Sequence, residues 1–487
     1  MRDLVKWQVV SFTSRMLAMA LGLVQTFVII RILSVGEWGL VQLAVSIGGA
    51  LGIYQHLGLA SASTREISSA KDKKQITKIF VTSAFVRYCV TLPLAVGLFF
   101  LSKHIALNLY KNSDLIFPLR VYAVSLIFQG IQSILNSVIS GTKRFKELFI
   151  YQVAIAGVSV GLYIPLVYFF KVSGFFYAFL AFNIISSIAL SVVAFRPFKG
   201  KFVFPNRKEF IVLLKEIFSI SIAIYVVKII YTNWEKLGSN FLGLSNSPEV
   251  VAIYAFALLY AKKLMNISDS VTAVNLPVLS EKYSKDIKEF RMTFSENFNK
   301  VFSLIVFIGA FASYFAPIAI RVLVGSDKYD ASLPLIAPMV LAFMMYSFIN
   351  IFNSSVMIPA KLSKSMVLSY GLLIIGSGAF FGVTFKFMEL LPAVAWGMAF
   401  GGIVSFFAMN MIIKKKLMSV FFHTDHTMVL IQAFSIAWLC VVENVVVKGF
   451  AFVPFAFLLG WSFFISGFIK KSDVLYIRSK IKLSRKK

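Results

Sequence analysis

Fourteen long apolar runs determine what this chain can fold into. Each is close to the length of about 20 residues that a helix needs to cross a bilayer. The runs are continuous and do not alternate between apolar and polar residues, which indicates helices rather than barrel strands. They cover residues 8–30, 38–60, 79–101, 118–140, 149–170, 174–195, 213–241, 249–273, 301–323, 334–358, 366–385, 391–413, 428–446 and 449–469. We therefore expect an all-α polytopic membrane protein with about 14 transmembrane helices.

The composition supports a membrane protein but leaves the meaning of its net charge open. Hydrophobic residues make up 59% of the chain and charged residues 14%, whereas soluble domains carry about 25% charged residues. Lys and Arg number 49 against 21 Asp and Glu, which gives a net charge of +28. Such an excess indicates nucleic-acid binding in a soluble protein, whereas in a membrane protein it can mark the cytoplasmic loops.

The positions of the basic residues decide between these two interpretations. If the loops alternate between two sides, about 33 Lys and Arg fall on the side that holds both termini and about 9 on the other. This asymmetry predicts that both termini are cytoplasmic. The basic tail from residue 470 then serves as a topology anchor that touches anionic membrane lipids, and we expect no nucleic-acid partner.

The order of polar residues and loops suggests an internal repeat. Gln42 in the second run corresponds to Tyr254 in the eighth, and short inward loops follow the fourth and tenth runs. This spacing predicts two six-helix lobes, joined by a basic linker, and a C-terminal helix pair. The expected segments are an N-terminal lobe at 1–209, a C-terminal lobe at 210–420, and helices 13 and 14 with the cytoplasmic tail at 421–487. Transporters often place a substrate site between such repeats.

Polar residues recur at helical spacing inside several runs, where they are costly unless they face a partner or a cavity. The stripes comprise Gln42, Ser46, Gly49 and His56 in the second run, Ser125, Gln129, Gln132, Asn136 and Ser140 in the fourth, and Tyr346, Asn350, Asn353 and Ser354 in the tenth. Any single amide can instead hold two helices together. As a set, the stripes predict an aqueous central cavity between the halves.

Basic side chains inside the runs give the predicted cavity a positive charge. Arg15, Lys262 and Lys263 lie deep, share faces with polar residues and outnumber the acidic residues, so we expect them to contact a ligand. For Arg87, both a structural pair and a ligand role are open. A phosphate or pyrophosphate would bind through charge-assisted hydrogen bonds, and amides suit sugar hydroxyls. The residues thus point to a lipid-linked sugar phosphate.

Other groups of chemical interest are few. Glu235 and Asp269 could couple transport to H⁺ or Na⁺, although Glu235 could also only neutralise a lysine. The two cysteines lie in separate apolar runs and predict neither a disulfide nor a metal site. His423 and His426 fall in an inward loop without further ligands nearby, so we expect them to be solvated. We expect no catalytic residues, no metal and no cofactor.

The turn between the first two runs, from Arg31 to Gly39, resembles the R-x-L-x-x-x-x-x-G turn of bacterial polysaccharide transporters. The basic linker before the seventh run, the stretch from Lys236 to Tyr254, and Pro277 are also similar. On these residues the chain resembles the multidrug/oligosaccharidyl-lipid/polysaccharide (MOP) exporter superfamily, in its branch of O-antigen flippases.

This resemblance implies two six-helix lobes around a central cavity and alternating access. It implies that the pyrophosphate of an undecaprenyl-linked oligosaccharide contacts Arg15, Lys228, Lys262 and Lys263. The sugars would contact cavity-lining amides and hydroxyls, which here are Gln42, Ser46, Gln129, Gln132, Asn136, Asn350 and Asn353. It also implies a place in the bacterial cytoplasmic membrane, within lipopolysaccharide or other surface polysaccharide biosynthesis, with other assembly proteins as further partners.

Two alternatives stay open at this stage. A multidrug or cation exporter of the same superfamily would need an acidic or aromatic cavity. A membrane-embedded polysaccharide polymerase or ligase would typically need a large outward loop with catalytic residues, and the predicted outward loops are short. The flippase is therefore the function that the sequence favours.

Overall fold

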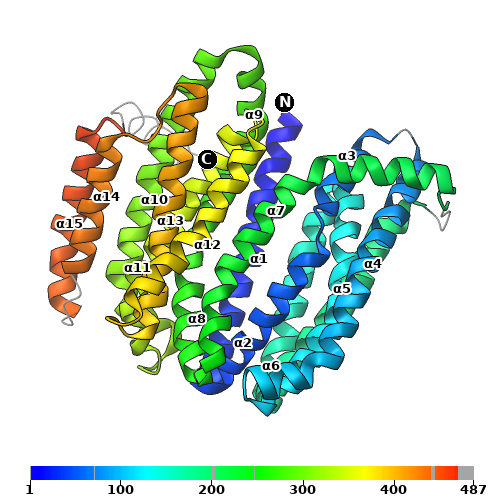
Figure 1. Cartoon of the computed structure of the whole chain (residues 1–487), viewed down its shortest axis with the longest axis horizontal. Coiled ribbons are helices and arrows are strands. Elements are labelled where there is room, and N and C mark those ends of the chain that lie inside the picture. The colour runs from blue at the N-terminus through cyan, green and yellow to red at the C-terminus, as the bar shows by residue number, and fades with distance from the viewer. Residues whose placement is uncertain (1, 71, 199–202, 246, 440–444, 470–487) are drawn as a thin grey trace, which may run out of the picture. The chain divides into compact units, whose positions relative to one another are not determined.

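The computed structural model describes residues 2–70, 72–198, 203–245, 247–439 and 445–469, and for some helical stretches, such as 2–16, only the course of the backbone. The α-helices are α1 (Arg2–Ile32), α2 (Val35–Gly52), α3 (Leu59–Ser69), α4 (Lys73–His104), α5 (Ile116–Gly141), α6 (Phe145–Phe195), α7 (Arg207–Ser245), α8 (Pro248–Lys262), α9 (Met265–Lys285), α10 (Ile287–Val324), α11 (Leu333–Phe352), α12 (Ser363–Thr384), α13 (Leu390–Leu417), α14 (Thr424–Leu439) and α15 (Val445–Ile465) (Figure 1). Short helical turns are η1 (Ile53–Gln55), η2 (Ile105–Leu109), η3 (Ser113–Leu115), η4 (Arg196–Phe198), η5 (Asp330–Ser332) and η6 (Asn353–Met357).

The described residues of the fourteen predicted runs lie almost entirely in helices, which confirms the all-α polytopic fold, and residues 440–444 of the thirteenth run lie outside the described residues. Among the described residues, nine helical segments are long and apolar enough to span a membrane by themselves, and shorter apolar helices accompany them. No strand occurs in the part of the chain that the structure describes. The chain is therefore a multi-pass membrane protein.

Packing between helices divides the chain into two compact units. Unit 1 comprises Met1–Ala255 together with Leu323–Lys328, and unit 2 comprises Phe256–Val322 together with Tyr329–Lys487. In unit 1, α7 packs against α2 and α3, and α5 packs against α4 and α6. In unit 2, α13 packs against both α11 and α12, and α14 lies beside α15 (Figure 1). The lobes that the sequence predicts, with boundaries at 209 and 420, stay a prediction.

The 51-residue element α6 is two antiparallel helices joined by a tight turn. At the turn, Lys171 has φ 52° and ψ −127°, which reverses the chain direction. The hydroxyl groups of Tyr151 and Ser186 form a 2.5 Å hydrogen bond across the hairpin. A Cβ on Gly174 would lie 1.9 Å from the carbonyl oxygen of Leu166, so the turn requires glycine there. The two separate runs that the sequence predicts for this segment are thus confirmed.

Helices α12 and α13 approach each other closely because small residues line their interface. A Cβ on Gly401 would lie 2.3 Å from the carbonyl oxygen of Leu373. Four residues further along α13, Ser405 donates a hydrogen bond of 2.7 Å to the carbonyl oxygen of Ser369. Small residues at a spacing of four allow such close packing in membranes, where no hydrophobic effect drives helices together.

Two of the predicted membrane helices are interrupted. The second run is built from α2, η1 and α3, and the break at residues 56–58 includes two residues with positive φ. The eighth run is built from α8 and α9, with a turn at Lys263 and Leu264 between them. The internal repeat predicted from the sequence pairs these same two runs. Interrupted helices in both halves of a repeat are a mark of transporter binding sites.

The core of unit 2 is a stack of phenylalanine rings. Phe290, Phe294, Phe298 and Phe302 recur every four residues on α10, and each is 1% exposed or less. Their rings pack against phenylalanines of α11, with centroids 4.9 and 6.0 Å apart in the contacts of Phe298, and against Phe421 and Phe422 beyond α13. This packing explains part of the use of 51 phenylalanines in the chain.

His426 belongs to this aromatic core, so the expectation that it is a solvated loop residue is wrong. Its side chain is fully buried, and its ring stacks on Phe468 and Phe422 at 4.3 and 5.0 Å. The backbone N–H of His423 donates to Nδ1 at 3.0 Å, and Nε2 donates to Oδ1 of Asn299 at 2.9 Å. Burial and the nearby His423 lower the pKa of His426 to about 3.

The neutral state of His426 makes stability depend on pH. Below a pH of about 6.5 the unfolded chain protonates this histidine, whereas the folded chain does not until its pKa near 3. Stability therefore falls as the pH decreases through this window. We expect wild type to lose about 2 kcal/mol more than His426→Phe between pH 7 and pH 5. Apparent melting temperatures at both pH values measure this difference. The exposed His104, changed to Gln, should keep the wild-type dependence, and identical dependences for wild type and His426→Phe would contradict the assignment.

Candidate functional site

The break between α8 and α9 brings two predicted site residues together. Lys262 ends α8, and Lys263 follows in the turn. The N–H of Lys263 donates to the carbonyl oxygen of Tyr260 at 3.4 Å, and that of Leu264 to Ala261 at 3.2 Å, so the last turn tightens before the chain restarts. No side chain caps α9, whose N-cap residue is Leu264. The hydroxyl of Tyr260 fixes this end of α8 to α10 by a 2.8 Å hydrogen bond to Ala312.

Positive charge accumulates at this break. Lys263 is exposed and Lys262 half-buried, and their adjacent ammonium groups repel each other. The N–H groups of Asn266 and Ile267 at the start of α9 donate to the carbonyl oxygens of Lys263 and Leu264 at 3.2 and 3.1 Å, so the two lysines supply the charge. Chemically, such an arrangement can bind an anion, above all one with several oxygens such as a phosphate.

Asp269 lies one turn further along α9 and contacts a predicted sugar-binding residue. The side-chain amide of Asn350 on α11 donates to Oδ1 of Asp269 at 2.8 Å and to the hydroxyl of Ser268 at 3.3 Å. The carboxylate itself is exposed. The structure therefore joins the predicted ion-coupling residue and a predicted cavity amide into one polar group, which the sequence treats separately.

Deeper in the same unit, buried amides surround the π-helical turn η6. Asn353 begins this turn, and its amide lies 3.4 Å from the Tyr370 hydroxyl, while its Oδ1 is buried without a partner among the described residues. Asn275 on α9 donates to Ser355 of the turn at 3.4 Å and accepts from Asn297 at 2.8 Å. Single π-helical turns occur frequently at functional sites. Asn275 and Asn297 did not stand out in the sequence, because their helices lack a continuous polar stripe.

In unit 1, several of the predicted cavity residues hold helices together. The amide of Gln132 on α5 donates to the carbonyl oxygen of Asn183 at 3.0 Å and to the Ser187 hydroxyl at 3.1 Å, both on α6. Buried Ser46 on α2 donates to the carbonyl oxygen of Lys236 on α7 at 3.4 Å. Glu235 is 5% exposed, and its Oε1 lies 3.5 Å from Nζ of Lys236.

Other predicted residues keep polar groups accessible. Gln42, Gln129 and Asn136 are half-buried, and Lys228 on α7 is exposed. Gln129 and Asn136 flank Gln132 on the same face of α5, so this face combines helix contacts with accessible amides. Arg15 lies in α1, but its side chain is outside the described residues.

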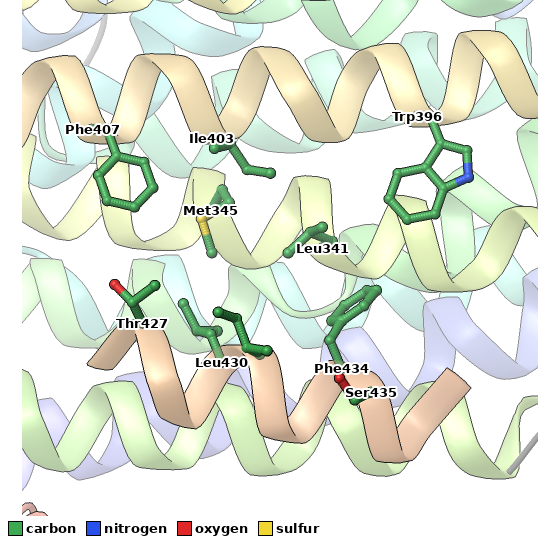
Figure 2. A pocket seen from close by; sticks show the side chains of 10 residues that line it. Leu341, Met345, Trp396, Ile403, Phe407, Thr427, Leu430, Phe434 and Ser435 are labelled. Carbon is green, nitrogen blue, oxygen red and sulfur yellow. The ribbon is translucent and has the colours of Figure 1, made fainter. Parts of the chain in front are cut away.

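An apolar cavity of about 730 Å³ lies in unit 2 and was not expected from the sequence. Figure 2 shows Trp396, Ile403 and Phe407 of α13 facing Leu430 and Phe434 of α14 across it. The remaining lining residues are Leu341 and Met345 of α11, and Thr427, Ile431 and Ser435 of α14. An apolar residue that lines such a cavity has the same sequence signature as one that faces lipid, so hydropathy alone cannot find it.

Among the described residues, no group of three or more His, Cys, Asp or Glu side chains is placed to hold a metal ion. Acidic side chains near the break of the eighth helix are few, and Asp269 stands beside amides. The described site combines lysines, amides and an apolar cavity.

Comparison with known proteins gives one family match and several structural likenesses. The family model described as polysaccharide biosynthesis protein matches residues 28–334. No curated protein matches the sequence.

Solved structures with a similar fold cover most of the chain. One is described as lipid II flippase MurJ in an inward closed conformation, with a TM-score of 0.70, 15% identity, and coverage of 95% of this chain and 99% of that one. Another is an inward-facing multidrug resistance MATE family transporter of the MOP superfamily, with a TM-score of 0.66, 16% identity, and coverage of 84% and 98%. A MOP superfamily transporter from Pyrococcus furiosus has a TM-score of 0.60, 15% identity, and coverage of 84% and 96%. At these identities the likenesses establish the fold.

Proposed function

The chain belongs to the polysaccharide biosynthesis protein family and has the fold of MOP superfamily transporters, and on this premise we propose that it is a flippase for a lipid-linked oligosaccharide. The substrate would be an undecaprenyl-pyrophosphate-linked repeat unit of O-antigen or another surface polysaccharide. The protein would move it by alternating access from the inner to the outer leaflet of the bacterial cytoplasmic membrane, with both termini cytoplasmic. The family match and the likeness to a lipid II flippase support this proposal.

The break in the eighth membrane helix is the observation that carries the proposal. Lys262 and Lys263 stand there beside the uncapped N-terminus of α9. A basic residue inside a membrane is expensive unless it serves a partner. The charges of two adjacent lysines fit the pyrophosphate of such a substrate and disfavour a cationic drug. Arg15 and Lys228 would contribute further positive charge.

The other parts of the substrate have matching surfaces in the proposal. The accessible amides of Gln42, Gln129 and Asn136 would bind sugar hydroxyls, together with Asn350 and Asn353 in unit 2. The apolar cavity of about 730 Å³ would hold part of the polyprenyl tail, since its size is typical of ligand pockets, which measure roughly 300–1,000 Å³.

The charge of the substrate can supply the driving force. A membrane potential that is negative inside favours outward movement of an anion by about 2.3 kcal/mol for each charge and each 100 mV. Return of the empty carrier could be coupled to H⁺ or Na⁺ at Asp269, whose carboxylate accepts a hydrogen bond from Asn350, or at Glu235. Other polysaccharide assembly proteins would act before and after this step.

Translocation by the purified protein in liposomes tests the proposal. A fluorescent undecaprenyl-pyrophosphate oligosaccharide placed in one leaflet should become accessible to a membrane-impermeant quencher in the other, and liposomes without protein serve as the control. The cationic dye ethidium should not be exported. Dye export without lipid movement would instead identify a cation exporter, and lengthening of the oligosaccharide would identify a polymerase.

A further inference from the structure

The break in the second membrane helix has an unusual backbone. Between η1 and α3, Leu57 has φ 46° and Gly58 has φ 68°. The left-handed region is unfavourable for leucine, and such strain persists only where the surrounding structure holds it. Helix α3 then begins at Leu59, and no side chain caps it. In its first turn, the N–H groups of Leu59 and Ala62 already donate to the carbonyl oxygens of His56 and Gly58 at 3.0 and 3.4 Å. The N–H groups of Ala60 and Ser61 between them are ones that helix geometry leaves without an intrahelical partner.

Arg87 of α4 contacts the first residue of this break, His56. Its side chain is fully buried, yet its hydrogen-bond partners are all neutral. The guanidinium donates to the carbonyl oxygen of His56 at 3.0 Å, to Nδ1 of His56 at 3.1 Å and to the Ser133 hydroxyl at 2.8 Å. Its buried Nε has no partner in the part of the chain that the structure describes. A buried charge without a counter-ion among the described residues is strongly unfavourable, and its positive potential favours an anion at the adjacent break.

The contact with Arg87 sets the state of His56. A guanidinium can only donate hydrogen bonds, so Nδ1 of His56 must accept, and the ring proton lies on Nε2. The His56 side chain is half-buried. The imidazole is therefore neutral and presents one N–H donor that Arg87 does not use.

Lys228 is placed at the same break by α7. The hydroxyl of Tyr225 donates to the carbonyl oxygen of Tyr54 in η1 at 2.8 Å, which fixes α7 against the interruption. Lys228 follows one helical turn later, is exposed, and lies close enough for its charge to act on His56 and Arg87. The break at residues 56–58 thus brings together three basic side chains, those of His56, Arg87 and Lys228, and the N-terminus of α3.

We propose that this break is a second phosphate-binding subsite, in which Lys228, the Nε2–H of His56 and the N–H groups of Ala60 and Ser61 bind one phosphate group. Arg87 is a positioning residue, which fixes the tautomer of His56 and contributes positive charge without contacting the phosphate. The subsite deepens the proposed function and rests on it, because the phosphate would belong to the diphosphate of the lipid substrate. Unit 1 would thereby carry an anion site of its own, as unit 2 would at Lys262 and Lys263.

Binding of diphosphates to the full-length protein in lipid nanodiscs tests the proposal by calorimetry. The probes are inorganic pyrophosphate and geranylgeranyl diphosphate. We expect Lys228→Gln to weaken the binding of both about tenfold, which corresponds to about 1.4 kcal/mol. His56→Leu should weaken binding several-fold, whereas His56→Gln, which keeps an N–H donor, should restore most of it. Lys208→Gln at the exposed start of the same helix is the matched control and should bind as wild type does.

The tautomer of His56 tests the role of Arg87 separately. In protein with ¹⁵N-labelled histidine, the His56 signals should show the Nε2–H form, and Arg87→Met, which cannot donate to Nδ1, should allow the other tautomer to appear. Arg120→Gln, at an exposed arginine of α5, should leave them unchanged. A purely structural arginine would alter stability without this shift.

The outcomes distinguish this inference from the proposed function. If Lys228→Gln and His56→Leu bind pyrophosphate with wild-type affinity while the Lys262 and Lys263 variants do not, the second subsite is wrong and the flippase proposal stands. If wild type binds neither diphosphate, the proposed function fails and the subsite fails with it.

Discussion

Changing Lys262 and Lys263 together to glutamine should slow translocation of a lipid-pyrophosphate oligosaccharide about 100-fold at subsaturating substrate. A hydrogen bond to a charged group contributes about 1.5–3 kcal/mol, and each 1.4 kcal/mol corresponds to a factor of about ten. Loss of two such bonds therefore accounts for a factor of about 100 or more. Glutamine keeps the polarity and most of the length of the side chain, so the change removes charge with little effect on packing.

The measurement is the initial rate at which quencher-accessible substrate appears in proteoliposomes. Lys364→Gln, at an exposed lysine in the first turn of α12, is the control in the same unit. Single variants should each lose about tenfold if the two lysines act independently. Wild-type rates for the double variant would exclude the break of the eighth helix as the pyrophosphate site.

The membrane helices could be predicted because hydropathy and length alone define them. The turn inside α6 was also visible, since polar and small residues separate its two apolar runs. The interruption at Lys263 was not, because residues 262–264 include neither glycine nor proline. The break results from tertiary contacts, such as the hydrogen bond from Tyr260 to Ala312, that no local pattern records. Gly58, by contrast, was a visible signal for the break in the second run.

Helical spacing shows which side chains share a face of one helix, but it does not show what another helix places opposite them. Gln132 was grouped with Gln129 and Asn136 on spacing, yet its amide donates to residues of α6. The contact between Asp269 and Asn350 depends on how α9 and α11 pack. His426 shows the same effect for a loop residue, because only the fold reveals that Phe422 and Phe468 enclose it. The sequence shows the charge and type of each side chain, but the residues that contact it follow only from the fold.

The turn from Arg31 to Gly39 shows how a short motif can encode packing. Ser34 and Glu37 form a capping box at the start of α2, with reciprocal hydrogen bonds of 2.8 and 3.2 Å. The Arg31 side chain donates to the carbonyl oxygen of Leu323 at 3.0 Å. Together these contacts fix the end of α1 and the start of α2.

The capped turn also brings α2 directly against the start of α8. A Cβ on Gly39 would lie only 1.7 Å from the carbonyl oxygen of Pro248. The glycine of the motif is therefore required because a backbone, rather than a flexible side chain, occupies the space. This close approach gives the motif a physical reason that does not involve the substrate.

Gly39→Ala should accordingly destabilise the protein by about 3 kcal/mol, since overpacking of a tight contact forces helices apart. Gly36 in the first turn of α2 and Gly97 in α4 provide a graded comparison. A Cβ on Gly36 would meet only the end of the Glu249 side chain, which can rotate away, and a Cβ on Gly97 would meet nothing within 4 Å. We expect Gly36→Ala to be nearly neutral and Gly97→Ala neutral or slightly stabilising, because alanine favours helix more than glycine does. Apparent melting temperatures in detergent measure the series. Equal melting temperatures for the three variants would show that the close approach of α2 and α8 does not limit stability. The expected order would instead show that the glycine of the motif serves helix packing, and the proposed transport chemistry would stay with the lysines.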